Sequence, residues 1–159
     1  MDKTRLVIYN AVMRKKSKMA GLVSRALLVL GVSILIVSFF APWAYGQGLL
    51  GLASKTIYPY QDSSFRLVLG LLIIIIGAIF FSMLARFYSS FIIFLSGTGI
   101  LFLGFYLWRE IEASDLHFLG LAPLKLAEAH PDVGIFLLIG AGIFLILSAV
   151  LSVLGKQKW

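Results

Sequence analysis

The sequence predicts an all-α integral membrane protein, an antiparallel four-helix bundle that forms a single membrane domain over residues 1–159. Two observations point to this class. First, 60% of the residues are hydrophobic and only 13% are charged, whereas a soluble domain carries about 25% charged residues. Second, four apolar runs are long enough to cross the hydrocarbon layer, which takes about 20 helical residues. Because lipid offers the backbone no hydrogen-bond partners, such runs must be helical.

The predicted spans contain no ionisable residue. They cover about 26–43, 67–85, 87–108 and 133–154, and the loops between them cover about 44–66 and 109–132. The second and third are separate spans, because together they are about twice as long as one crossing requires, and a charge, Arg86, lies near the middle. The first span is too long, and starts too far along the chain, for a signal peptide. Residues 1–21 form a basic N-terminal segment and 155–159 a short tail.

Positive charge is concentrated on one side of the predicted bundle. Loops rich in lysine and arginine stay in the cytoplasm, so we expect both termini there, in a multi-pass protein of the plasma (cytoplasmic) membrane. The loops 44–66 and 109–132 then lie outside, with four cations and six acids. The inner side has one acid, Asp2, and ten cations, which are Lys3, Arg5, Arg14, Lys15, Lys16, Lys18, Arg25, Arg86, Lys156 and Lys158.

Small residues recur in the spans at intervals of seven. Seven residues are close to two helical turns, so each series lies along one face of its helix. Small side chains allow the close backbone approach that favours helix association in lipid. We therefore expect a left-handed, closely packed bundle, although small residues are abundant enough for some such spacings to arise by chance. The positions are Ser24, Gly31 and Ser38, then Gly70 and Gly77, then Ser90, Gly97 and Gly104, and finally Gly134, Ala141, Ser148 and Gly155.

Tryptophan and tyrosine residues mark the predicted outer ends of the spans. Their rings prefer the level of the lipid headgroups, so we expect interface anchors at Trp43, Tyr45, Tyr58, Tyr60 and Trp108. Residues 46–51 of the first loop also match the dinucleotide-binding pattern Gly-x-Gly-x-x-Gly. That motif requires a preceding strand, and here a membrane helix precedes it, so we expect no nucleotide site.

The second loop contains both histidines and five of the seven acids. Imidazole and carboxylate groups are ligands for zinc, copper or iron, and the candidate ligands are Asp115, His117, Glu128, His130 and Asp132. A metal site would require the loop to fold back, because neither Asp115 with His117 nor Glu128 with His130 has the i, i+4 spacing that puts two ligands on one helical face. We favour the structural interpretation, in which His130, Pro131 and Asp132 begin the fourth helix.

The absence of charge within the spans argues against pumps and proton-coupled carriers, which place ionisable groups in the membrane. We expect no catalytic residue, no cofactor and no nucleic-acid partner. The leading hypothesis is a structural or accessory subunit that packs against membrane lipids and against other subunits or itself. A small channel or carrier and an outer-surface metal-binding protein are the alternatives. The plan of four spans resembles that of claudin-like small membrane proteins, but the paired cysteines and tryptophan motif of claudins are missing, so no residue role follows.

Overall fold

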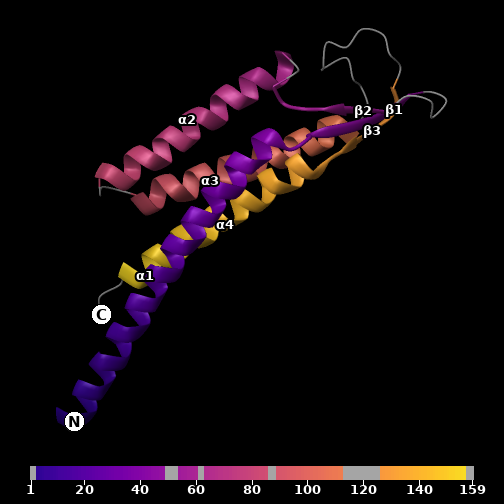
Figure 1. The fold of residues 1–159 in the computed structure, drawn as a ribbon. Coiled ribbons are helices and arrows are strands. Elements are labelled where there is room, and N and C mark those ends of the chain that lie inside the picture. Colours follow the sequence, from indigo (N-terminus) through magenta and orange to yellow (C-terminus); the bar gives the residue numbers. More distant parts are fainter. Residues whose placement is uncertain (1–2, 49–53, 61–62, 86–88, 113–125, 157–159) are drawn as a thin grey trace.

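The computed structural model describes residues 3–48, 54–60, 63–85, 89–112 and 126–156. This part of the chain is mostly helical, and a small sheet lies at one end of the helices (Figure 1). The helices are α1 (Lys3–Phe40), α2 (Ser63–Ala85), α3 (Ser89–Glu112) and α4 (Val133–Lys156), and the strands are β1 (Ala44–Gly48), β2 (Ser54–Ile57) and β3 (Leu126–Pro131).

Helix α1 is one continuous helix of 38 residues. Its N-terminal part projects beyond the ends of the other helices (Figure 1), so the basic segment predicted as a separate unit continues directly into the first span. The helix ends at Phe40, earlier than the predicted boundary at 43. Proline lacks the amide hydrogen that a helix needs, so the helix cannot continue through Pro42. The next amide, from Trp43, donates instead to the carbonyl of Ile57 at 2.9 Å.

The two loops contribute a three-stranded antiparallel sheet in the order β2-β1-β3. In this respect the all-α prediction is wrong. Tyr45 in β1 pairs with Thr56 on one side and with His130 on the other. Residues His130 and Pro131 therefore belong to a strand, whereas the sequence favours them as the start of the fourth helix, which begins at Val133.

Three helices of the described chain are long and apolar enough to cross a membrane. They are Lys18–Ser38 within α1, Ser90–Glu112 in α3 and Val133–Leu154 in α4. The chain is therefore that of a mostly helical membrane protein, as its composition predicts. The corresponding apolar stretch of α2, Arg66–Phe81, is shorter.

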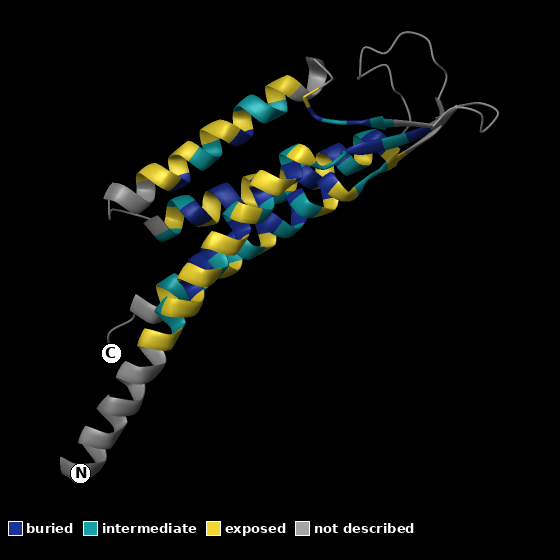
Figure 2. Cartoon of the chain, viewed as in Figure 1, coloured by how far each residue is buried: buried dark blue, intermediate teal, exposed yellow. Residues whose placement is uncertain are grey.

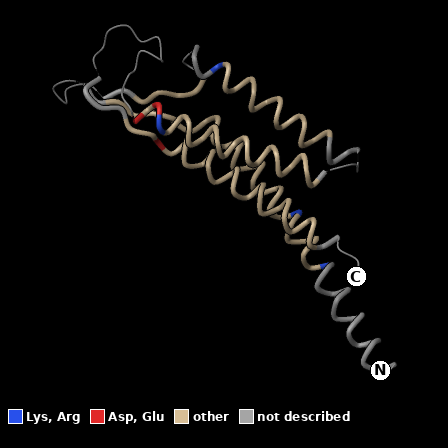
Figure 3. Tube along the Cα trace, turned by 180° about the vertical axis from the view of Figure 1, so that it is seen from behind, with Lys and Arg blue, Asp and Glu red and all other residues tan. Residues whose placement is uncertain are grey.

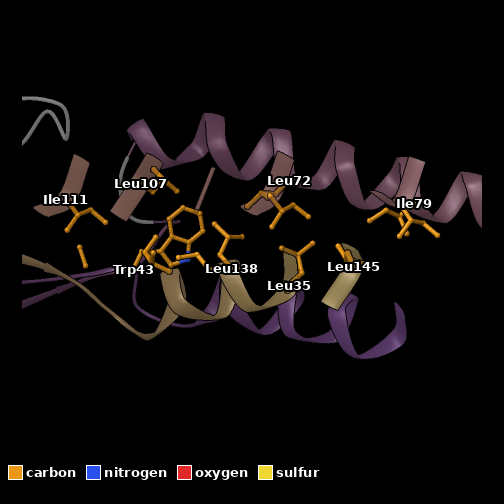
Figure 4. Close-up of a cluster of buried hydrophobic side chains, with 14 of the residues drawn as sticks. Leu35, Trp43, Leu72, Ile79, Leu107, Ile111, Leu138 and Leu145 are labelled. Carbon is orange, nitrogen blue, oxygen red and sulfur yellow. The ribbon is translucent and has the colours of Figure 1, made fainter. Parts of the chain in front are cut away.

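The helices are arranged around α4. Both α1 and α3 pack along α4, whereas α2 packs mainly on α3, on the side away from α4 (Figure 1). One hydrophobic cluster runs through the assembly. Figure 4 shows Trp43 and Leu107 toward the sheet end of this cluster, and Leu145 and Ile79 toward the other end. The packing surfaces of α4 therefore organise the fold, and they are the place to look for its function.

Candidate functional site

Two serines join α1 to α4 through reciprocal hydrogen bonds. The hydroxyl of Ser24 donates to the carbonyl oxygen of Ser148 at 2.8 Å, and the hydroxyl of Ser148 donates to the carbonyl oxygen of Ser24 at 2.8 Å. Both side chains are buried. Hydrogen bonds of this kind hold membrane helices together at a modest free energy each, about 0.6 kcal/mol on average. One heptad further along α1, a Cβ on Gly31 would lie 3.2 Å from Cγ of Leu145.

Glycines allow α3 to approach α4 even more closely. A Cβ built on Gly142 would lie 2.9 Å from the carbonyl oxygen of Gly97 and 2.9 Å from the amide nitrogen of Leu101. Two helical turns away, a Cβ on Gly104 would lie 2.7 Å from Cγ1 of Ile139. The helices therefore touch backbone to backbone, which only glycine permits at this distance.

Helix α4 has two adjacent rows of small residues, of which the heptad spacing in the sequence predicted one. The row through Ala141 and Ser148 includes the serine that bonds α1, while the row through Gly142 and Ala149 is offset by one position. Ala149 is buried, and Ser152 accepts or donates a 2.9 Å hydrogen bond with Ser90 of α3. A helix packed between two neighbours needs two such rows. The repeated pairs 141–142 and 148–149, seven residues apart, are the signal that identifies the second row.

Trp43 joins α1, the sheet and α4. Its indole Nε1 donates to the carbonyl oxygen of Ser38 at 2.8 Å, and its own carbonyl oxygen accepts from the amide of Asp132 at 3.0 Å. The side chain is completely buried. Trp43 thus lies inside the protein, whereas the sequence places an anchor at the lipid interface. Because its polar N–H group is already bonded within the fold, the ring has no need of a headgroup.

The glycine at position 134 lets α4 begin directly against Trp43. A Cβ there would overlap Cδ1 of the Trp43 ring and lie 2.7 Å from the carbonyl oxygen of Pro42. The amide of Gly134 donates to that same oxygen at 2.8 Å. The carboxylate of Asp132 accepts from the amide of Val133 at 2.6 Å. The first amides of α4 are thereby satisfied by the α1–β1 connection and by the residue that precedes the helix.

The other aromatic residues near this end lie closer to the surface. Tyr60 is 53% exposed and its ring stacks on that of Tyr58, with centroids 5.5 Å apart. The indole of Trp108 donates to Oε2 of Glu112 at 3.0 Å, and its ring meets that of Phe136 edge-on at 5.0 Å. Tyr45 is half-buried in β1. Four of the five residues expected as anchors therefore keep some exposure beside the sheet.

Helix α2 differs from the others because its glycines contact no neighbour. A Cβ on Gly70 or Gly77 would meet nothing within 4 Å outside its own stretch of helix. The same face carries Ile74 and Phe81, which are 72% and 73% exposed, since these four residues follow one another at helical intervals of four, three and four. Figure 2 shows much of α2 exposed, and its buried residues, Leu72 and Ile79, lie on a different face from the two glycines.

The residues predicted as metal ligands are not brought together within the described part of the chain. Asp115 and His117 lie outside the described residues. Glu128 pairs with Gln47 in the sheet, but its side chain is not described. His130 is exposed on β3, and the Asp132 carboxylate binds the start of α4. Among the described residues, no group of three or more histidine or acidic side chains is placed to hold a metal ion. The side-chain surroundings of Gly155, the last predicted packing position, also lie outside the description.

Described charges lie toward the two ends of the helices (Figure 3). At the sheet end, Arg66 and Arg109 are accompanied by the acids Glu110, Glu112 and Asp132. Toward the opposite end, the described charges are cationic, from Lys18 and Arg25. We call this opposite end, where α1 carries Lys18 and α4 reaches Lys156, the basic end.

No known protein family matches this chain, and no curated protein is significantly similar to it.

Proposed function

We propose that this protein is a structural or accessory subunit that associates laterally in the membrane, and that the Gly70–Gly77 face of α2 is its contact surface. The partner is a transmembrane helix of a larger complex or of a second copy of the chain. The protein is multi-pass in the plasma (cytoplasmic) membrane, with α2 as a fourth span. Both termini lie in the cytoplasm, as the excess of cations at the basic end favours.

The contrast between the heptad glycines of α2, which lie against no neighbour, and the heptad glycines of α3, which lie against α4, carries this proposal. In α3 and α4, the space that a side chain would take at Gly97, Gly104 or Gly142 is occupied by atoms of a neighbouring helix. At Gly70 and Gly77 that space is open. Glycine in an exposed helix interior costs stability relative to alanine. In lipid its advantage is close approach of a second helix. An α2 face with two glycines one heptad apart is therefore suited to a helix from another protein molecule.

The experiment uses the absence of cysteine from the sequence. A single Gly77→Cys variant, labelled in its own membrane with a benzophenone maleimide and irradiated, should crosslink to a protein. Gly99→Cys is the matched control, because Gly99 is an exposed glycine of α3 that also has no atom within 4 Å of its Cβ position. Mass spectrometry of the adduct then distinguishes a second copy from a different subunit.

Native mass spectrometry of the untagged protein, gently extracted, provides the second readout. We expect a defined assembly that Gly77→Leu weakens and Gly99→Leu leaves intact. A monomer without protein partners, or lipid adducts alone from position 77, would refute the proposal.

The described contacts favour neither alternative. The hydroxyls of Ser24, Ser148 and Ser38 bond backbone carbonyls within the helix packing. A channel would produce flux in reconstituted liposomes that empty liposomes lack. A metal function would require bound metal that is lost when His117 and His130 are both replaced by alanine.

A further inference from the structure

The Gly70–Gly77 face of α2 has a cation at its sheet end. Gly70 follows Arg66 by four residues and Gly77 follows Gly70 by seven, so all three lie along one side of the helix. Arg66 is exposed. The buried residues of α2, Leu72 and Ile79, lie on the opposite side at these helical intervals. The face is therefore apolar along most of its length and positively charged at one end.

The charge of Arg66 is not matched within the described part of the chain. Among the described residues, its guanidinium takes part in no hydrogen bond and no ion pair. The first turn of α2 has no acid. Two acids at the sheet end bind within their own segments, since Glu112 accepts a hydrogen bond from Trp108 and Asp132 accepts one from the amide that follows it. A counterion for Arg66 is thus left for another molecule to provide.

A helix packed on the Gly70–Gly77 face would also cover Arg66. Gly70 is about one helical turn from Arg66, and its missing side chain lets a second helix approach closely. That helix displaces water and lipid headgroups from the side of Arg66 that it covers. Because a desolvated cation is costly unless an opposite charge pairs with it, the covering helix has to bring an anionic group to this level. Among protein side chains that group is a carboxylate, which an arginine can bind through two parallel hydrogen bonds.

A second copy of the chain does not provide this carboxylate through the same face. Copies of one chain insert into the membrane in the same orientation, and a twofold contact places the same surface of both copies together. Two Arg66 side chains would then meet at the end of the contact, and like charges oppose association. A different subunit can place an acid there instead.

We infer that the helix docked on α2 belongs to a different protein subunit and carries an aspartate or glutamate that pairs with Arg66 at the sheet end of its span. This inference rests on the proposed contact on α2 and specifies its partner. Since the charge lies at one end of the face only, the ion pair also fixes the position of the partner helix along α2.

Carbodiimide crosslinking in the native membrane tests the ion pair. Arg66→Lys keeps the cation and provides a primary amine. A water-soluble carbodiimide joins this amine to an adjacent carboxylate as an amide, and the carbodiimide takes up the water that is lost and leaves as a urea. We expect a crosslink to a different protein, at an aspartate or glutamate located by peptide mass spectrometry. Arg109→Lys is the matched control, because Arg109 is an exposed arginine at the same end but on α3, and it should give no crosslink to that protein.

Neutralising and reversing the charge measure its contribution to the assembly. The readout is the amount of the second subunit that co-purifies after gentle extraction, by native mass spectrometry. Arg66→Gln should weaken the association roughly two- to fivefold, the effect of one exposed ion pair. Arg66→Glu should weaken it further, because two carboxylates then face each other. Arg109→Gln should leave it unchanged.

This inference and the proposed function fail in different ways. If Gly77→Cys photocrosslinks to no protein, the contact on α2 is absent and both are refuted. If that crosslink forms but its partner is a second copy of the chain, the contact on α2 stands and only the inference is overturned. The same holds if Arg66→Glu leaves the association unchanged, or if the amine introduced at position 66 reaches no carboxylate of the partner.

Discussion

Replacing Gly142 by alanine should destabilise the protein, whereas the same replacement at Gly140, two residues away on α4, should not. The added Cβ at position 142 would lie 2.9 Å from two backbone atoms of α3, and ordinary contacts begin near 3.4 Å. Helix α3 would have to move by about half an ångström. A Cβ at position 140 meets nothing within 4 Å.

The magnitude follows from these two environments. Inserting a methyl group into a filled contact costs about 1–3 kcal/mol. The cost at position 142 belongs near the upper part of that range, because backbone atoms cannot rotate away as a side chain can. At position 140 the methyl group removes backbone freedom from the unfolded chain, a gain of up to about 1 kcal/mol. The two variants should therefore differ by roughly 2 kcal/mol or more.

Unfolding by sodium dodecyl sulfate in bicelles, followed by far-ultraviolet circular dichroism, measures this difference. The pair Gly97→Ala and Gly99→Ala repeats the test on α3. An added Cβ at position 97 would meet atoms of α4, whereas one at position 99 would meet nothing within 4 Å. If Gly142→Ala and Gly140→Ala changed the unfolding free energy equally, and Gly97→Ala and Gly99→Ala did so too, then α3 and α4 would not approach each other as closely as described.

Three further predictions concern the other contacts. Ser24→Ala and Ser148→Ala should each cost about 0.6 kcal/mol in the same unfolding assay, because each removes one hydroxyl that donates to a backbone carbonyl, while the carbonyl that accepts the other bond is kept; unchanged stability of both variants would contradict the pairing. Trp43→Ala should cost about 3–5 kcal/mol in the same unfolding assay, and Trp43→Phe, which keeps the ring but loses the bond to Ser38, should cost less; an unchanged stability would contradict its burial. Gly134→Val should destabilise α4 against the Trp43 ring, so that the tryptophan fluorescence shifts to longer wavelength; an unshifted spectrum would contradict that contact.

The membrane character and the helical class were predictable, because they depend on local composition. The fourth span was predicted at 133–154, and α4 contains the apolar span Val133–Leu154. The first span was placed too far along the chain, at 26–43, since Pro42 and Trp43 count as apolar although the helix has ended at Phe40. The number of spans stays a prediction.

The sheet was not predictable from local pattern. Strand β1 contains two glycines, and β2 is only four residues long, so neither shows the alternation of a half-buried strand. Strand β3 pairs with β1 from far along the chain, as in the Tyr45 and His130 pair. The heptad series likewise indicates which residues are small enough for a seam, but it does not indicate which helix each seam faces. That is why Gly70 and Gly77 could be singled out but not placed.

The serine pair between α1 and α4 has a consequence for biosynthesis. Ser24 and Ser148 are 124 positions apart. Ribosomes add about 5–20 residues each second, so α1 emerges roughly 6–25 s before its partner. During that interval α1 enters the bilayer without the helix that buries its serine and glycine face, and β1 has no β3. A chain truncated before α4 would therefore expose this unpaired face to the membrane's quality-control proteases. Insertion of the last helix buries the face and makes the protein resistant to them.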